Sequence, residues 1–127
     1  MLEKLKFKKI PKENKNMTAK IKIQNLPKEL RKKGLEKKLL KICKENDIVF
    51  MVLFGSYAKG EQTSKSDIDI AIEFNKNSRK TLLDIIKIEM ELEKIFGRKV
   101  DLGILSSINP YVIDNVKKEM KIIYEKK

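Results

Sequence analysis

The feature that most constrains the fold is a run of seven apolar residues, Ile48 to Phe54, which ends abruptly at Gly55-Ser56. The run is rich in β-branched and aromatic side chains and has no polar position, which is typical of a strand buried on both faces. Such a strand needs other strands beside it and helices over it. The chain is therefore expected to form a sheet covered by helices.

The segments around this run alternate between helical and strand periodicity. Apolar residues recur at helical spacing before the run and again between Thr81 and Phe96, where Gly97 follows in the position of a C-cap. Strict alternation with a period of two marks the strands. The pattern predicts helices over 35–46, 81–96 and 110–120, strands over 48–54, 67–74 and 100–105, and a short terminal strand or helix end over 121–124.

The first 33 residues differ from the rest in composition. They form a Lys-rich extension broken by Pro11 and Pro27, and their short alternating stretches at 5–7 and 21–23 fit either edge strands or mobile chain. With twelve Lys and Arg against three Glu, the extension holds nine of the twelve net positive charges. We expect a basic extension over residues 1–33 and one folded domain over residues 34–127.

Composition excludes several classes of chemistry. The chain has no histidine, which excludes Ser-His-Asp and Cys-His catalysis and every His-containing zinc site. Its single cysteine, Cys43, lies in an apolar stripe and is expected to be a buried thiol without a chemical role. Oxygen ligands remain, so any metal should be a hard cation such as Mg²⁺ or Mn²⁺. No apolar run approaches the roughly 20 residues of a membrane-spanning helix, and we expect a cytoplasmic protein.

Asp67 and Asp69 stand two residues apart in a predicted strand, so their side chains share one face. Two adjacent carboxylates repel each other unless a cation lies between them, and Mg²⁺ takes one or two carboxylates together with waters and phosphates. The structural alternative is that Asp67 follows a turn and Asp69 is solvated on an open face. The residues alone leave both interpretations open.

The Gly55-Ser56 turn after the buried strand offers backbone N–H groups and a hydroxyl to an anion. It is not a Walker A loop, because Gly60 is followed by Glu61-Gln62 instead of Lys-Ser/Thr. The segment after Asp69 is not an EF-hand loop either, because apolar residues continue the strand.

Three motifs together resemble the minimal nucleotidyltransferases of the DNA polymerase β superfamily. They are Leu53-Phe54-Gly55-Ser56-Tyr57-Ala58-Lys59-Gly60, Ser66-Asp67-Ile68-Asp69-Ile70 and Val100-Asp101-Leu102, and the similarity covers about residues 35–124. The resemblance implies the α/β nucleotidyltransferase fold, with a mixed sheet of three to four strands flanked by helices.

The resemblance also implies the site. Gly55 and Ser56 would hold the β- and γ-phosphates of an NTP, and Asp67 and Asp69 would ligate Mg²⁺. Asp101 would bind a second ion or deprotonate the acceptor hydroxyl. Lys59 stands where relatives often carry Arg, so it would attract phosphate without binding it in a bidentate manner. Such a site transfers a nucleoside monophosphate with two Mg²⁺ ions, for which Mn²⁺ is the expected substitute.

Stand-alone minimal nucleotidyltransferases resemble antitoxins that attach AMP to a tyrosine of an all-helical HEPN toxin, which implies ATP as donor and a HEPN-type protein as partner. Two alternatives stay open. One is a binding antitoxin with a vestigial nucleotide site. The other is an enzyme or binder of nucleic acid that uses the basic extension, although only one aromatic residue there, Phe7, is available to stack on bases. Lys and Glu enrichment is also typical of proteins from hot environments and accounts equally well for the charge.

Overall fold

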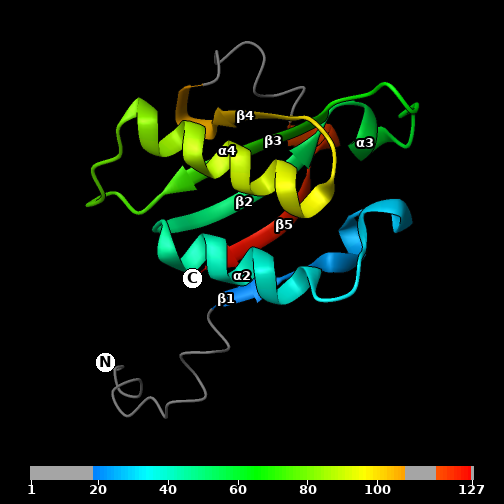
Figure 1. The fold of residues 1–127 in the computed structure, drawn as a ribbon. Coiled ribbons are helices and arrows are strands. Elements are labelled where there is room, and N and C mark those ends of the chain that lie inside the picture. The colour runs from blue at the N-terminus through cyan, green and yellow to red at the C-terminus, as the bar shows by residue number, and fades with distance from the viewer. Residues whose placement is uncertain (1–18, 108–116, 127) are drawn as a thin grey trace, which may run out of the picture.

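The computed structural model describes residues 19–107 and 117–126. Its elements, in chain order, are β1 (Ala19–Ile21), η1 (Ile23–Asn25), η2 (Lys28–Leu30), α2 (Leu35–Glu45), β2 (Ile48–Phe54), α3 (Ser56–Lys59), β3 (Ile68–Phe74), α4 (Leu82–Phe96), β4 (Val100–Ile104), η3 (Leu105–Ser107) and β5 (Lys121–Lys126). The strands form a sheet, and the two long helices, α2 and α4, lie beside it (Figure 1).

The five strands form one mixed sheet in the order β1-β5-β2-β3-β4. The β3–β4 pair is parallel and the other pairs are antiparallel. The parallel pair is joined through α4, as a parallel connection requires a crossover. The predicted mixed α/β sheet is therefore confirmed, with five strands where three to four were expected.

The two long helices cover one face of the sheet, with α2 against β2 and α4 against β4 and α2 (Figure 1). Between them and the sheet lies the core, where the alternating isoleucines of β3, Ile68, Ile70 and Ile72, are fully buried. Cys43 is also fully buried, and burial raises the pKa of its thiol to about 12. The predicted role of Cys43 as an inert core residue agrees with this placement.

Part of the basic extension packs onto the rest of the fold. Strand β1 pairs with β5 at the sheet edge, and Leu26 and Leu30 join the hydrophobic core with 1% of their surface exposed. Of the stretch at 21–23, Ile21 lies in this edge strand, whereas Ile23 begins the short helix η1. The division of the chain at residue 33 into extension and domain stays a prediction.

Most predicted boundaries agree with the structure to within one or two residues. The strand expected from Asp67 begins at Ile68, and the terminal segment at 121–124 is a strand instead of a helix end. Most of the helix expected over 110–120 lies outside the described residues. Within the described part of that range, residues 117–119 are helical. No helix within the described ranges is long and apolar enough to cross a membrane.

Candidate active site

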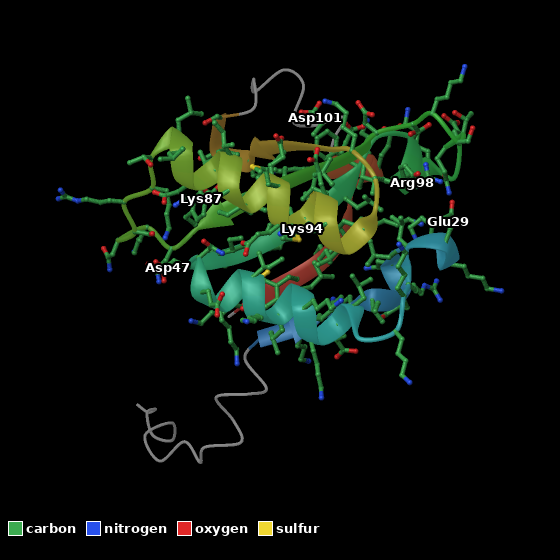
Figure 2. All side chains as sticks on the ribbon, viewed as in Figure 1. Glu29, Asp47, Lys87, Lys94, Arg98 and Asp101 are labelled. Carbon is green, nitrogen blue, oxygen red and sulfur yellow. The ribbon has the colours of Figure 1, made fainter. Side chains whose placement is uncertain are left out.

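The three candidate carboxylates come from neighbouring positions at one end of the sheet. Asp69 in β3 and Asp101 in β4 are register partners in the parallel pair, and Asp67 directly precedes β3. Asp69 is also the register partner of Phe54, the last residue of β2 before α3. Figure 2 shows Asp101 at this same end of the sheet. We call this end, with Asp67, Asp69, Asp101 and the Gly55-Ser56 turn, the carboxylate end.

Like charges surround Asp69. Its side chain is partly buried, and the pKa of its carboxyl is raised, first by loss of hydration and then by the charges of Asp101 and Asp67. Within residues 19–107 and 117–126, no Lys or Arg forms an ion pair with any of these three carboxylates. The described part of the chain thus holds three acidic groups near one another without a cation of its own paired to them, which costs stability unless a bound cation offsets it.

The donor set suits a hard cation. In the described part of the chain, no three His, Cys, Asp or Glu side chains converge into a ready-made metal cage. Mg²⁺ does not require one, because it keeps several waters and binds through one or two carboxylates together with substrate phosphates. Asp67, Asp69 and Asp101 are therefore the residues that would hold such an ion.

Position 55 requires glycine for two reasons, its backbone conformation and its close contact with Asp69. Its φ of 72° and ψ of −153° lie in a region that is essentially confined to glycine. A Cβ atom at this position would collide with Asp69 Oδ2 and would lie 3.0 Å from Asp69 Cγ. The carboxylate of Asp69 therefore lies directly against the backbone of the turn, so a phosphate at the turn and a cation at Asp69 would be neighbours.

Ser56 and Lys59 are the first and last residues of α3. The first N–H groups of a helix have no partner within the helix, so the start of α3 leaves donors beside the half-buried Ser56. Lys59 Nζ lies 3.7 Å from Glu119 Oε1, and both side chains are more than a third exposed. This ion pair is weak in water and leaves the Lys59 ammonium free to exchange partners.

Two glutamates of α4 fix β4 on either side of Asp101. The Val100 N–H donates to Glu93 Oε2 over 3.1 Å, and the Leu102 N–H donates to Glu89 Oε2 over 3.0 Å. Both N–H groups lie on the edge of β4 that faces away from β3, so the glutamates occupy donors that another strand would otherwise need to satisfy. They hold Asp101 at its register position opposite Asp69.

The loop between α3 and Asp67 is held by contacts that sequence reasoning missed. Arg98 donates from Nη1 to the Ser64 carbonyl over 3.1 Å, and its guanidinium lies 6.0 Å from the centre of the Tyr57 ring. Gln62 Nε2 donates to Glu29 Oε2 over 2.8 Å. Figure 2 shows Glu29 and Arg98 near one another beside α3. These partners are 33 or more positions apart, so no local pattern reveals them.

Comparison with known families agrees with this geometry. The family model described as polymerase beta, nucleotidyltransferase matches residues 37–127. A protein of Methanocaldococcus jannaschii with the provisional name of a protein adenylyltransferase is 43% identical over 90 residues, which cover 69% of this chain and 90% of that protein. The protein adenylyltransferase MntA of Thermococcus cleftensis is 37% identical over 68 residues, covering 54% of this chain and 67% of that protein.

A solved structure adds a likeness in three dimensions. One chain of a crystal structure of a toxin–antitoxin complex with AMP-PNP superposes with a TM-score of 0.60 and is 26% identical. The match covers 72% of this chain and 73% of that chain. The match of the family model begins at residue 37, so the extension that packs beside α3 lies outside it.

Proposed function

This chain belongs to the polymerase β nucleotidyltransferase family, and from that premise we propose that it transfers AMP from ATP, with Mg²⁺, to a hydroxyl group of a partner protein. The observation that carries the proposal is the register pairing of Asp69 with Asp101 beside the Gly55 turn. It supports one site in which a phosphate cradle adjoins three carboxylates.

Each residue then has a defined task. Gly55 and Ser56 cradle the β- and γ-phosphates through the donors at the start of α3. Asp67 and Asp69 hold the metal ion, and Asp101 either holds a second ion or accepts the proton of the acceptor hydroxyl. Bound Mg²⁺ supplies charge neutralisation on the entering and leaving oxygens, which is the main requirement of nucleotidyl transfer. Lys59 attracts the phosphates as a point charge.

The choice of acceptor rests on the relatives. Two of them bear the name protein adenylyltransferase, and the similar solved chain comes from a toxin–antitoxin complex with an ATP analogue. The resemblance to minimal nucleotidyltransferases adds a HEPN-type toxin as the partner. We therefore propose that the chain is the antitoxin of such a pair and neutralises its toxin by adenylylation.

The test is a transfer assay with the purified chain, Mg²⁺, ATP labelled at the α-phosphate, and either a HEPN-type protein from the same organism or a cell lysate. Label on a protein band, lost in Asp69→Asn, is the expected result. Label on RNA would instead favour the nucleic-acid alternative. Transfer by Asp69→Asn at the wild-type rate would contradict the assignment of the site.

The binding antitoxin with a vestigial nucleotide site is the second candidate, favoured by the likeness to a chain that was solved in a toxin–antitoxin complex. It predicts that Asp69→Asn still neutralises the toxin in a growth-rescue assay. The catalytic proposal predicts that rescue and transfer disappear together.

A further inference from the structure

Asp67 differs from the other two candidate ligands because it lies just outside the sheet. Asp69 and Asp101 are register partners in the β3–β4 pair, whereas β3 begins at Ile68, one residue after Asp67. Asp67 belongs to the α3–β3 loop, residues 60–67. The position of its carboxylate relative to the other two therefore depends on what holds this loop.

The α3–β3 loop contains a tight turn that is closed by its own bonds. The Thr63 N–H donates to Ser66 Oγ over 2.8 Å, and the Ser66 N–H donates to the Thr63 carbonyl over 3.1 Å. The Lys65 N–H donates to Thr63 Oγ1 over 3.2 Å. These bonds join loop residues to one another, so they fix the shape of the turn and not its place relative to β3 and β4.

Two consecutive residues of the turn between α4 and β4 hold the chain on both sides of Asp67. Arg98 Nη1 donates to the carbonyl of Ser64, three residues before Asp67, over 3.1 Å. The N–H of Ile68, one residue after Asp67, donates to the Lys99 carbonyl over 2.9 Å. The same turn leads directly into β4, so a single segment sets both the start of β4 and the backbone around Asp67.

The guanidinium of Arg98 also reaches α3. It lies 6.0 Å from the centre of the Tyr57 ring, a distance at which the ring face attracts a cation. Tyr57 belongs to the hydrophobic core with 2% of its surface exposed, and Arg98 is itself half-buried. Because Tyr57 directly follows Ser56, one side chain connects the helix of the Gly55-Ser56 turn with the loop that carries Asp67.

A second contact holds the loop from the extension. Gln62 Nε2 donates to Glu29 Oε2 over 2.8 Å, and this bond is the main cause of the lowered pKa of Glu29, to which the charge of Arg98 contributes. Glu29 lies in η2, which is anchored in the core by Leu30 (Figure 2). Residues 28–30 lie outside the match to the family model, so this contact is an addition to the family pattern.

We infer that Arg98 is a positioning residue for metal binding, which holds the Asp67 carboxylate beside the two carboxylates of the sheet, and that Glu29 supports the same loop through Gln62. This inference rests on the proposed function, since it takes Asp67 as a ligand of Mg²⁺. Arg98 acts through Asp67 and through α3. Loss of a residue that orients a metal ligand typically lowers metal affinity or activity by about 10- to 100-fold.

The test measures the Mg²⁺ concentration at which a non-hydrolysable ATP analogue gives half of its full increase in the thermal unfolding midpoint of the full chain. Arg98→Lys keeps the charge but loses the planar donor group, so this concentration should rise roughly tenfold or more. Arg79→Lys, the same change at an exposed position before α4, should match wild type. In ligand-free Arg98→Lys, amide hydrogen exchange should be faster over residues 61–66 and unchanged in α4.

Saturating Mg²⁺ should restore AMP transfer by Arg98→Lys to nearly the wild-type rate, because a misplaced ligand weakens metal binding without abolishing it. A purely structural role would leave the Mg²⁺ requirement unchanged. Glu29→Ala, at an exposed position, keeps the test decisive if Arg98→Lys fails to fold, and it should raise the Mg²⁺ requirement severalfold.

A wild-type Mg²⁺ requirement in Arg98→Lys, or in Glu29→Ala where that variant replaces it, would overturn the inference and leave the proposed function standing. An equal rise in Arg79→Lys would do the same. No Mg²⁺-dependent stabilisation of wild type by the analogue would instead overturn the proposed function, and this inference with it.

Discussion

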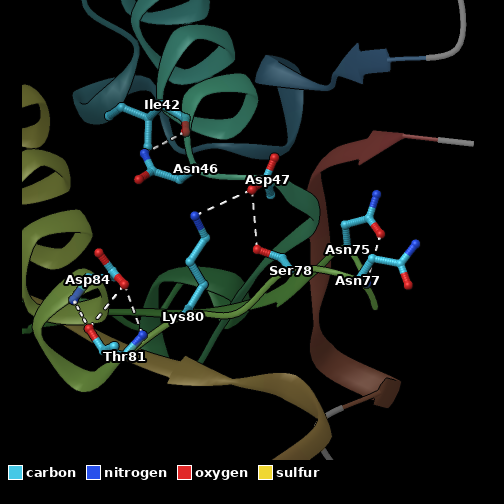
Figure 3. A network of polar contacts seen from close by, with 9 residues as sticks. All are labelled: Ile42, Asn46, Asp47, Asn75, Asn77, Ser78, Lys80, Thr81 and Asp84. Carbon is cyan, nitrogen blue, oxygen red and sulfur yellow. Dashed lines mark hydrogen bonds and ion pairs between the residues drawn. The ribbon is translucent and has the colours of Figure 1, made fainter.

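The two ends of the β2–β3 pair place the same kind of residue in opposite surroundings. The strands are antiparallel, so the carboxylate end lies where β2 ends and β3 begins. At the other end, where β2 begins and β3 ends, Asp47 and Asp84 belong to a network of polar contacts (Figure 3). We call this second region the network end; its members are Asp47, Asn75, Asn77, Ser78, Lys80, Thr81 and Asp84.

Each carboxylate at the network end has donors from its own surroundings. Asp47 Oδ2 accepts from Ser78 Oγ over 3.2 Å and lies 3.4 Å from Lys80 Nζ. Asp84 Oδ2 accepts from the backbone N–H and the hydroxyl of Thr81, over 2.9 and 3.0 Å, and closes a capping box at the start of α4. These bonds lower the pKa of Asp84, whereas burial and neighbouring carboxylates raise the pKa of Asp69.

The source of the stabilising groups separates a structural Asp from a candidate metal ligand in this protein. At the network end the protein itself supplies the groups that stabilise the charge, so loss of an Asp should cost stability. At the carboxylate end the protein supplies further negative charge, so loss of an Asp should relieve repulsion and cost only function. Substitutions at the carboxylate end should therefore lower activity without lowering stability, and substitutions at the network end should lower stability without lowering activity.

The largest expected effect is on catalysis. Asp69→Asn should lower the rate of AMP transfer by roughly a hundred- to a thousandfold, the scale of losing a group that stabilises transition-state charge. The thermal unfolding midpoint should stay the same or rise. Asp84→Asn is the matched control, with lower stability and a transfer rate near wild type. The comparison fails if Asp84→Asn abolishes transfer in a protein that remains folded.

Gly55→Ala should disturb the carboxylate end through the backbone. The substitution costs roughly 1–3 kcal/mol for its disfavoured φ and ψ, and the new Cβ also displaces the Asp69 carboxylate. Gly60→Ala is the control, since Gly60 also has a positive φ of 75° but has no atom within 4 Å of the added Cβ. Denaturant unfolding should show a larger loss for Gly55→Ala. Equal losses would mean that Asp69 is not held against the turn.

Thr81→Ala should weaken the network end by about 1 kcal/mol, the usual contribution of an N-cap side chain. Transfer should be unaffected, because Thr81 lies at the far end of the β2–β3 pair from Asp69. Urea titration of Thr81→Ala and Thr81→Ser, together with the transfer assay, checks both statements. Thr81→Ser should recover most of the lost stability; if it does not, the hydroxyl bond to Asp84 is not the stabilising contact.

The smallest expected effect is a difference in pH dependence. The pKa of Asp69 is raised, so between the ordinary Asp pKa and this raised value the folded protein keeps a proton that the unfolded chain has lost. Stability therefore falls as pH rises through that interval, and Asp69→Asn should remove this fall. The pKa of Asp84 is lowered, so its contribution is present above the ordinary Asp pKa and is lost as pH falls through the lowered value.

Denaturant unfolding of wild type, Asp69→Asn and Asp84→Asn from pH 3 to pH 7, without divalent metal, checks these signs. The advantage of Asp69→Asn over wild type should grow as pH rises, and so should the deficit of Asp84→Asn. An Asp69→Asn protein that is less stable than wild type at pH 7 would contradict the repulsion at the carboxylate end.

Local periodicity was sufficient to predict the elements at both ends. The apolar run of β2, the alternation of β3 and the helical stripe of α4 each reflect burial of neighbouring residues, which repeats within a few positions. The Gly97 C-cap was predicted from the same local chemistry, whereas the Thr81 capping box is seen in the structure alone. Of the candidate site, the sequence predicted that the side chains of Asp67 and Asp69 share one face of a strand and that a glycine turn precedes them; the strand begins one residue later, at Ile68.

Contacts between distant segments could not be predicted in this way. The register that places Asp101 opposite Asp69 depends on how β3 and β4 pair, and their residues are separated by α4. The collision that makes Gly55 necessary depends on the same packing. The burial of Leu26 and Leu30 was missed because Pro27 and short, Lys-rich stretches hide any periodicity in the extension.

The most direct test of the central claim, that the carboxylate end holds a metal ion and an NTP together, is thermal unfolding with a non-hydrolysable ATP analogue and Mg²⁺. Wild type should be stabilised only when both are present, by about 2.7 kcal/mol at a hundredfold excess over the dissociation constant. Asp84→Asn should show the same increment from its lower baseline, and Asp69→Asn should show none. An equal increment in Asp69→Asn, or no increment in wild type with any NTP analogue, would contradict the account.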